Sequence, residues 1–259
     1  MGRGRSGRVS SSRPQTTPAQ TAQAQQPAQQ RRTAEYWKDY FDTADYEQAQ
    51  AALDEWNRER MDADNRSNDT PIQRFFHNIG WSDNTPEVMD EQQYQAAWRA
   101  AGQPQQWYHA DNDAGGATAQ DFANQFFGRG YDFAGNQYRH YVSNGVFGDG
   151  TYFANSARGS ANYGSNQFRG FLNKNARVIS FSRLQNEYNK YANSHPGFKQ
   201  MMSTVYGGYY DSDEKLSIFA AMRGYNVISN GRGYIAVLDR RAVTVSDQQR
   251  RTRNNMYNW

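Results

Sequence analysis

The chain has 259 residues, of which 37% are hydrophobic and 15% aromatic, and its mean hydropathy is −1.05. This composition favours a compact core built largely from Tyr, Phe and Trp, with other segments outside it. The absence of cysteine excludes disulfides, thiolate zinc sites and cysteine nucleophiles. The four histidines show no metal-ligand spacing, so no metal is expected.

The net charge of +3 is unevenly distributed. Of the 29 Lys and Arg, six lie in residues 1–33, where there is no acidic residue, so that 23 remain against 26 Asp and Glu. The segment has no aromatic residue, and it cannot bury enough apolar surface to offset its loss of conformational entropy. We predict a disordered basic tail over 1–33, which either contacts nucleic acid through phosphates or is simply solvated.

Residues 34–104 are expected to form a helical segment. Between 34 and 62, aromatic and aliphatic residues recur at three- and four-residue spacing, which places them on one helical face. A second helix is predicted from Thr85, with Pro86 in its first turn, to Gly102. These faces either dock a partner or pack against the following domain, and packing is the favoured interpretation.

From residue 105 to 246, short β-like runs alternate with brief helices, which predicts an α+β domain. Helices are expected after Thr118, Ser182 and Asp213. Residues 247–259 are polar and predict a C-terminal tail. Strands are expected at 106–109, 150–154, 168–172, 177–181, 225–228, 234–238 and 242–245.

The most informative stretch, residues 145–163, reads GVFGDGTYFANSARGSANY. A nicotinamide ring has apolar faces and a carboxamide, so its pocket needs aromatic walls and a hydroxyl or backbone partner. Tyr152, Tyr163 and Ser160 supply these groups, and Gly150 lets the backbone approach a dinucleotide closely. The alternative interpretation is an ordinary Gly- and Tyr-rich edge strand, with Tyr163 packed into the core.

The order Phe-Gly-x-Gly-x-Tyr-Phe-Ala, followed by Ser and then Ala-x-Tyr, resembles a segment of the diphtheria-toxin-like ADP-ribosyltransferases, which include the poly(ADP-ribose) polymerases. The resemblance implies a split antiparallel β-sheet core with short helices, and NAD as substrate. It implies a catalytic role for Tyr152, and NAD contacts from Gly150, Tyr152, Ser160 and Tyr163.

An upstream strand of the same family ends in His, usually followed by Gly. Trp107-Tyr108-His109-Ala110 resembles it, which implies that His109 holds the adenosine ribose as a catalytic residue and that the Ala110 backbone meets the carboxamide. A structural histidine is the competing interpretation. Tyr138-Arg139 resembles the start of arginine-type transferases, but too few residues separate it from Tyr152 for the helix that normally intervenes.

The family's late strand begins Glu-Tyr-Ile-Val, and its Glu binds the nicotinamide ribose, stabilises the oxocarbenium-like transition state and polarises the acceptor. The corresponding residues here are Gly233-Tyr234-Ile235-Ala236, so the resemblance fails at Gly233. Losing such an interaction typically costs about 2.7–4 kcal/mol. Glu214 or Asp149 either substitutes from another element or is a helix-start or turn carboxylate.

The first hypothesis is therefore a mono-ADP-ribosyltransferase-like phage or bacterial effector that binds NAD and transfers ADP-ribose to a protein or nucleic-acid acceptor. The alternative is a catalytically inactive binding or structural protein of the same fold, such as a virion component. Gly233 favours the alternative, whereas the register of Tyr152, Ser160 and Tyr163 favours the enzyme. We expect a soluble cytoplasmic protein, in the host cytoplasm or a virion, without a secretory signal or transmembrane segment.

Overall fold

The computed structural model describes residues 76, 79–111, 118–124, 130–131, 137–138, 147, 150–164, 166–196, 198–199, 202 and 211–251. The chain divides into two units, Met1–Gln30 and Arg31–Trp259, and every described residue belongs to the second. The tail expected over 1–33, the helix expected over 34–62 and residues 252–259 of the expected C-terminal tail lie outside the described residues.

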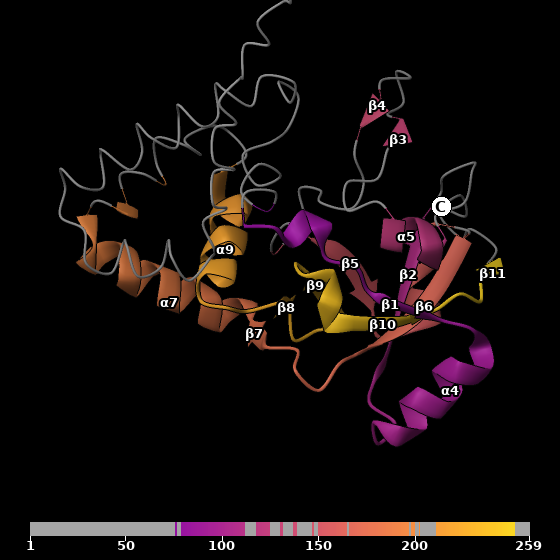
Figure 1. Cartoon of the computed structure of the whole chain (residues 1–259). Coiled ribbons are helices and arrows are strands. Elements are labelled where there is room, and N and C mark those ends of the chain that lie inside the picture. Colours follow the sequence, from indigo (N-terminus) through magenta and orange to yellow (C-terminus); the bar gives the residue numbers. More distant parts are fainter. Residues whose placement is uncertain are drawn as a thin grey trace, which may run out of the picture. The chain divides into compact units, whose positions relative to one another are not determined.

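The described residues form an α+β fold, as predicted (Figure 1). The helices are α4 (Glu91–Ala100), α5 (Ala119–Asn124), α6 (Ala157–Ser160), α7 (Phe181–Ser194) and α9 (Asp211–Met222), with the 3-10 turns η2 (Trp81–Asp83) and η3 (Arg240–Ala242). The strands are β1 (Glu87–Met89), β2 (Gln106–Asp111), β3 (Gly130–Tyr131), β4 (Gln137–Tyr138), β5 (Thr151–Ala154), β6 (Asn166–Leu172), β7 (Val178–Ser180), β8 (Val227–Ser229), β9 (Tyr234–Val237), β10 (Val243–Ser246) and β11 (Arg250–Arg251). Every strand predicted from the sequence has a counterpart here.

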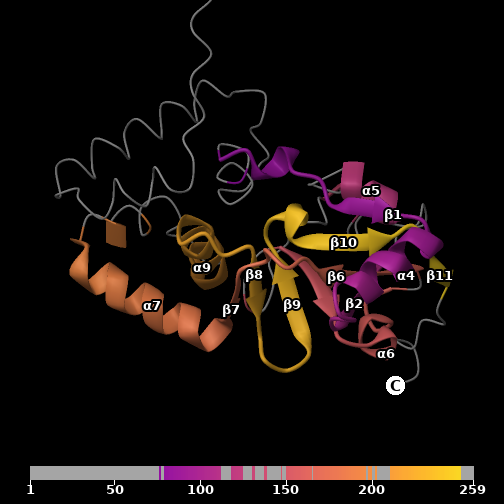
Figure 2. The same ribbon diagram turned by 60° about the horizontal axis from the view of Figure 1, so that its bottom comes forward.

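One open, mostly antiparallel sheet has the strand order β1-β10-β6-β2-β5-β9-β8-β7, with β11 also pairing with β6 (Figures 1 and 2). The outer pairs, β1 with β10 and β7 with β8, are parallel, and the pairs between them are antiparallel. The predicted site strand β5 thus lies inside the sheet, between β2 and β9. Its register with β9 sets Tyr152 opposite Ala236, and Ala154 opposite Tyr234.

The sheet also takes in residues outside the range 105–246. Strand β1 runs parallel to β10, with Val88 opposite Val245, and β11 pairs Arg250 with Gln167. The residues just before 105 therefore contribute a strand to the same sheet as the strands that carry the predicted site.

Helix α4 begins at Glu91, so the prediction of a helix from Thr85 was wrong at its N-terminal end. Val88 and Met89 belong to β1, where pairing with β10 overrides their helical spacing. Asp90 is the cap residue, because its side chain accepts the backbone N–H of Gln93 at 2.8 Å. At the other end Gly102 has φ +85°, a left-handed conformation that suits glycine, so the predicted end was nearly correct.

The apolar side chains form two clusters. One joins α7 and α9 to the sheet around Leu184, Phe219 and Ile228. The other packs Phe122 of α5 against Phe153 and Phe168. Residues 216–222 of α9 are all buried, which explains why this helix shows no amphipathic pattern in the sequence.

Helix α7 begins one residue before the Ser182 expected to precede it. The Ser180 side chain accepts the backbone N–H of Arg183 at 3.4 Å and caps the helix. Phe181, expected as the last residue of a strand, is the first of the helix. Thr118 and Asp121 likewise bond to each other's backbone N–H at 2.9 Å, and this fixes the start of α5.

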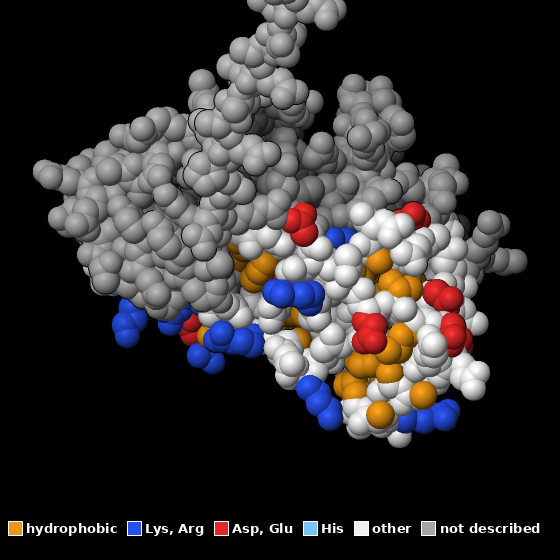
Figure 3. Space-filling view, viewed as in Figure 1, with side chains coloured by type: hydrophobic (Ala, Val, Ile, Leu, Met, Phe, Trp, Pro, Cys, Tyr) orange, Lys and Arg blue, Asp and Glu red, His pale blue; other side chains and the backbone are white. Residues whose placement is uncertain are grey.

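Charged side chains are unevenly distributed over the surface drawn in Figure 3. Lys and Arg gather along α7, while most Asp and Glu in this view lie towards α4 and β1. Within the described ranges, no helix combines the length and the apolar character that crossing a membrane requires.

Candidate functional site

Strand β5 fixes Tyr152 on the face of the sheet that packs against α7 and α9. Its ring lies edge-on to Phe147 at 4.8 Å, and the backbone N–H of Phe147 donates to the Tyr152 hydroxyl at 3.2 Å. Phe153 points to the other face, because side chains alternate along a strand, and it joins the α5 cluster. Tyr152 is therefore half-buried, and Phe147 contacts both its ring and its hydroxyl.

The turn of helix after β5 places Ser160. Ser156 caps α6 by accepting the Gly159 N–H at 3.1 Å. The Ser160 hydroxyl is buried, donates to the Ala157 carbonyl at 3.2 Å and accepts the side-chain amide of Gln167. The same amide nitrogen donates to the Ala157 carbonyl at 2.8 Å. Ser160 is thus positioned by β6, a role of Gln167 that the sequence pattern did not reveal.

Tyr163 is the most exposed large apolar side chain among the described residues, at 60% exposure. Its ring lies edge-on to Tyr234 at 6.2 Å, with an interplanar angle of 86°. Partial burial and the neighbouring Tyr234 raise the pKa of the Tyr163 phenol above its ordinary value. The alternative of a core-packed Tyr163 does not fit this exposure.

Tyr234, which contacts Tyr163, lies on the same face of the sheet as Tyr152. It lies opposite Ala154, and directly opposed side chains share a face of the sheet, so Tyr234 and Tyr152 are on the same face. Tyr163 and Tyr152 contact different rings, Tyr234 and Phe147. The sequence pattern did not single out Tyr234; the alternation of the strand after Gly233 is the signal that places it on this face.

His109 occupies the opposite face. Its ring packs against Phe153 and Phe168 at 5.5 and 5.1 Å, and its Nδ1 lies 2.7 Å from the Tyr152 carbonyl oxygen. The structure therefore ties His109 to the backbone of Tyr152 while placing the two rings on different faces. The contact with an adenosine ribose stays a prediction.

Ala110 and Gly150 have structural neighbours of their own. Ala110 is buried opposite Gln167, in the register of β2 and β6. At Gly150 a Cβ would lie 2.7 Å from the carbonyl oxygen of Val237, so glycine is needed for close approach to the neighbouring strand. Neither contact tests the NAD roles that the resemblance implies.

Gly233 sits directly before β9, beside the end of β5. Its φ is +98°, and a Cβ there would lie 2.8 to 3.0 Å from the side-chain amide atoms of Asn155. The Asn155 N–H donates to the Gly233 carbonyl at 2.7 Å and extends the pairing of the two strands. The backbone and the space at residue 233 both favour glycine. Asp149 and the Glu214 side chain lie outside the described residues.

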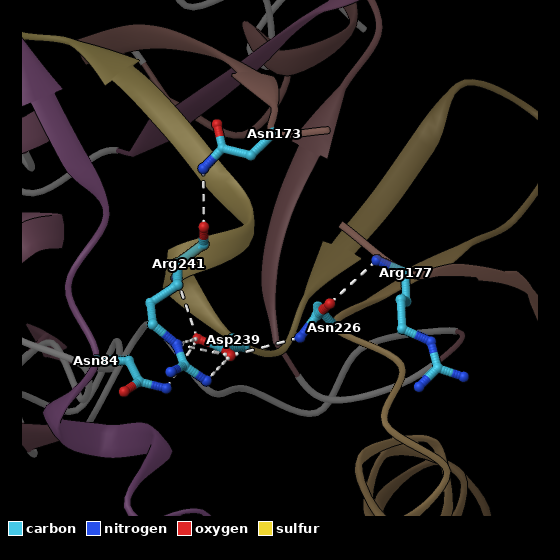
Figure 4. Close-up of polar contacts among 6 residues, drawn as sticks. All are labelled: Asn84, Asn173, Arg177, Asn226, Asp239 and Arg241. Atoms are coloured by element: carbon cyan, nitrogen blue, oxygen red, sulfur yellow. Dashed lines mark hydrogen bonds and ion pairs between the residues drawn. The ribbon is translucent and has the colours of Figure 1, made fainter. Parts of the chain in front are cut away.

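A separate buried carboxylate, Asp239, lies between β9 and η3 (Figure 4). It accepts Asn84 at 2.9 Å, Asn226 at 3.4 Å and the Arg241 guanidinium at 2.8 Å. Asn84 and Asn226 come from segments far from Asp239 in the sequence, so this cluster ties chain segments together. No group of three His, Cys, Asp or Glu suited to a metal occurs in the described part of the chain.

The surface is also hollowed between α7 and α9, away from the motif. The hollow has a volume of about 230 Å³ and is lined by Gln185, Tyr188, Asn189, Lys215 and Leu216. It contains none of the predicted site residues.

Comparisons of the chain with protein-family models, with curated proteins and with solved structures find no match. The assignment of residues 145–163 to an NAD site therefore depends on the motif and on the local geometry described above.

Proposed function

We propose that the chain binds NAD through the region of Tyr152, Ser160 and Tyr163 and is a mono-ADP-ribosyltransferase-like protein with a split antiparallel sheet. The exposed ring of Tyr163, held edge-on by Tyr234, is the observation that carries the proposal. A flat aromatic ring that is accessible to solvent, as Tyr163 is, suits stacking of a nicotinamide ring. The half-buried Tyr152 lies on the preceding strand β5.

In the reaction, the bond between the ribose C1′ and the nicotinamide nitrogen breaks, and nicotinamide leaves with the electron pair. An oxygen or nitrogen of a protein or nucleic-acid acceptor bonds to C1′ and loses its proton to solvent. The chain contributes by holding NAD in a reactive conformation, with Tyr152 and Tyr163 near the leaving group and His109 towards the distal ribose. Without a carboxylate at residue 233 this reaction is slow.

A second candidate function, NAD binding without turnover by a structural or virion protein, is favoured by one observation. Position 233 has a left-handed φ and faces the Asn155 amide, so it accommodates no side chain without rearrangement. Release of nicotinamide and transfer of labelled ADP-ribose distinguish the two functions, because only the enzyme produces them.

The binding test is calorimetric titration of the full chain with NAD, comparing wild type with Tyr163→Ala. Losing one stacked aromatic ring should weaken binding about tenfold or more, since such a stack contributes roughly 1–3 kcal/mol. Tyr163 is preferable to Tyr152 because its exposed ring can be removed without opening the core.

The control is Val178→Ala, which shortens the other exposed large apolar side chain among the described residues, 45% exposed and placed on β7 rather than beside the motif. We expect the control to bind NAD as the wild type does. Wild-type protein that shows no heat of binding at millimolar NAD, while its circular dichroism is that of a folded protein, would contradict the proposal.

A further inference from the structure

The side-chain amide of Asn155 lies beside Gly233, the position at which the family's glutamate is missing. We propose that this amide takes the place of the missing glutamate and holds the nicotinamide-side ribose of NAD through its hydroxyl groups. The inference rests on the proposed function and adds a residue that the motif did not single out.

The geometry at residue 233 supports this assignment. A Cβ on Gly233 would lie 2.8 Å from Nδ2, 2.9 Å from Cγ and 3.0 Å from Oδ1 of Asn155. The whole amide group therefore occupies the space into which a side chain at 233 would first extend. The hairpin turn between β8 and β9 and the start of α6 lie near one another in Figure 2, and the Asn155 N–H bonds to the Gly233 carbonyl at 2.7 Å.

The Asn155 backbone makes its structural bonds, and its side chain is exposed. The backbone N–H pairs with Gly233, and the carbonyl accepts the side-chain amide of Gln105 at 3.2 Å. The described hydrogen bonds of Asn155 all use these backbone atoms. The amide is consequently available to a ligand, and truncating it leaves the strand pairing intact.

The ring surfaces of the site are close to this amide. Asn155 directly follows Ala154, which opposes Tyr234, and Tyr234 contacts the exposed Tyr163 ring. A nicotinamide stacked on Tyr163 would carry its ribose within reach of the strand end that holds Asn155. An amide both donates and accepts hydrogen bonds, as two ribose hydroxyls require.

With an amide in place of the family's glutamate, the chain would bind NAD but turn it over slowly. An amide can bond to the ribose hydroxyls, but it has no negative charge with which to stabilise an oxocarbenium-like transition state. A carboxylate placed on Asn155, rather than on Gly233, should supply that charge. Gly233→Glu would have to displace the Asn155 amide and adopt a φ of +98°, which side-chain-bearing residues rarely take.

The first experiment titrates NAD into wild type, Asn155→Ala and the control Asn186→Ala, which is exposed on α7. We expect Asn155→Ala to weaken binding about tenfold, while the control binds as the wild type does. Wild type that binds NAD together with an Asn155→Ala variant of equal affinity would overturn the inference and leave the proposed function standing. Wild type that does not bind NAD would overturn both.

The second experiment measures nicotinamide release from NAD by Asn155→Glu, with Asn186→Glu as the charge-matched control. In hydrolysis, water bonds to C1′ and gives a proton to solvent while neutral nicotinamide leaves. We expect Asn155→Glu to release nicotinamide about a hundredfold faster than the control, the size of effect that one well-placed electrostatic group has on such a step. Equal rates for two folded variants would overturn the inference.

Discussion

Gln167 is a buried amide that connects the middle of the sheet to α6. Its side-chain nitrogen donates to the Ala157 carbonyl and to the Ser160 hydroxyl, and the residue is only 1% exposed. Since a carbonyl can only accept, this contact also sets which end of the amide faces α6. The position of Ser160 thus depends on Gln167, which lies on the next strand along the chain, β6.

We expect Gln167→Leu to lower the free energy of unfolding by about 1–3 kcal/mol, because the buried Ser160 hydroxyl and the partly buried Ala157 carbonyl lose a donor. The loss is partly offset, since leucine also removes an amide oxygen with no partner among the described groups. Urea denaturation measures the change. Gln185→Leu, on the exposed face of α7, should change it by less than about 0.5 kcal/mol. Equal effects of the two substitutions would contradict this role for Gln167.

The sequence identified Tyr152, Ser160 and Tyr163 because their spacing along one segment is visible in it. Asn155, Gln167 and Tyr234 come to lie beside Gly233, Ser160 and Tyr163 only through the folding together of different strands and turns. A lone polar residue in a buried strand, as at Gln167, is a signal, but it does not tell which partner satisfies it.

Helix α4 is attached to the sheet through its first residue, Glu91. One carboxylate oxygen pairs with Arg169 of β6 and accepts Gln95 at 2.9 Å, and the other accepts the Ser246 hydroxyl of β10 at 3.0 Å. The helix and two strands are therefore joined at one carboxylate. The predicted helix from Thr85 placed Glu91 inside the helix, whereas Glu91 is its first residue.

Glu91 should make stability depend on pH. Burial raises the pKa of Glu91, but hydrogen bonds from Gln95 and Ser246 and the charges of Arg169 and Arg250 outweigh it and hold this pKa below its ordinary 4.5. A depressed carboxyl pKa contributes stability that is present above that ordinary value and is lost as the pH falls through the folded-state pKa.

We therefore expect Glu91→Gln to be less stable than wild type at pH 7 and to approach it as the pH falls below about 4.5. Urea midpoints measured at several pH values test this. A Gln92→Ala control on the exposed side of α4 should differ from wild type by a constant amount. A Glu91→Gln difference that stays constant with pH would show that the charge of Glu91 does not contribute.

At the scale of the whole described fold, Asp239 joins segments that are far apart in the sequence (Figure 4). It is 1% exposed and binds Asn84, Asn226 and Arg241. Asn226 in turn accepts the backbone N–H of Arg177 at 3.0 Å, so the network connects the segments before β1, β7, β8 and β10.

Asp239→Ala should lower the free energy of unfolding by roughly 2–4 kcal/mol, because several buried or partly buried donors lose a charged acceptor. Arg241→Ala should cost less than about 1 kcal/mol, since the Arg241 side chain is 61% exposed and remains hydrated when free. Urea denaturation followed by circular dichroism and by tryptophan fluorescence measures both. An Asp239→Ala variant as stable as Arg241→Ala would contradict this account.

The sequence by itself determined the elements of this protein. Alternating apolar residues, cap residues and glycines predict an α+β domain and seven of its strands, β2 and β5 to β10, because strand and cap preferences depend on neighbouring residues. It also determined the motif around Tyr152, whose residues lie in one segment.

Only the tertiary structure decided the order of the strands, the recruitment of Val88 and Met89 into β1, and the faces on which His109 and Tyr152 lie. These features depend on pairing between distant segments, and local spacing carries no information about it. The same holds for Asn155, whose amide comes to lie over Gly233 only when β5 pairs with β9.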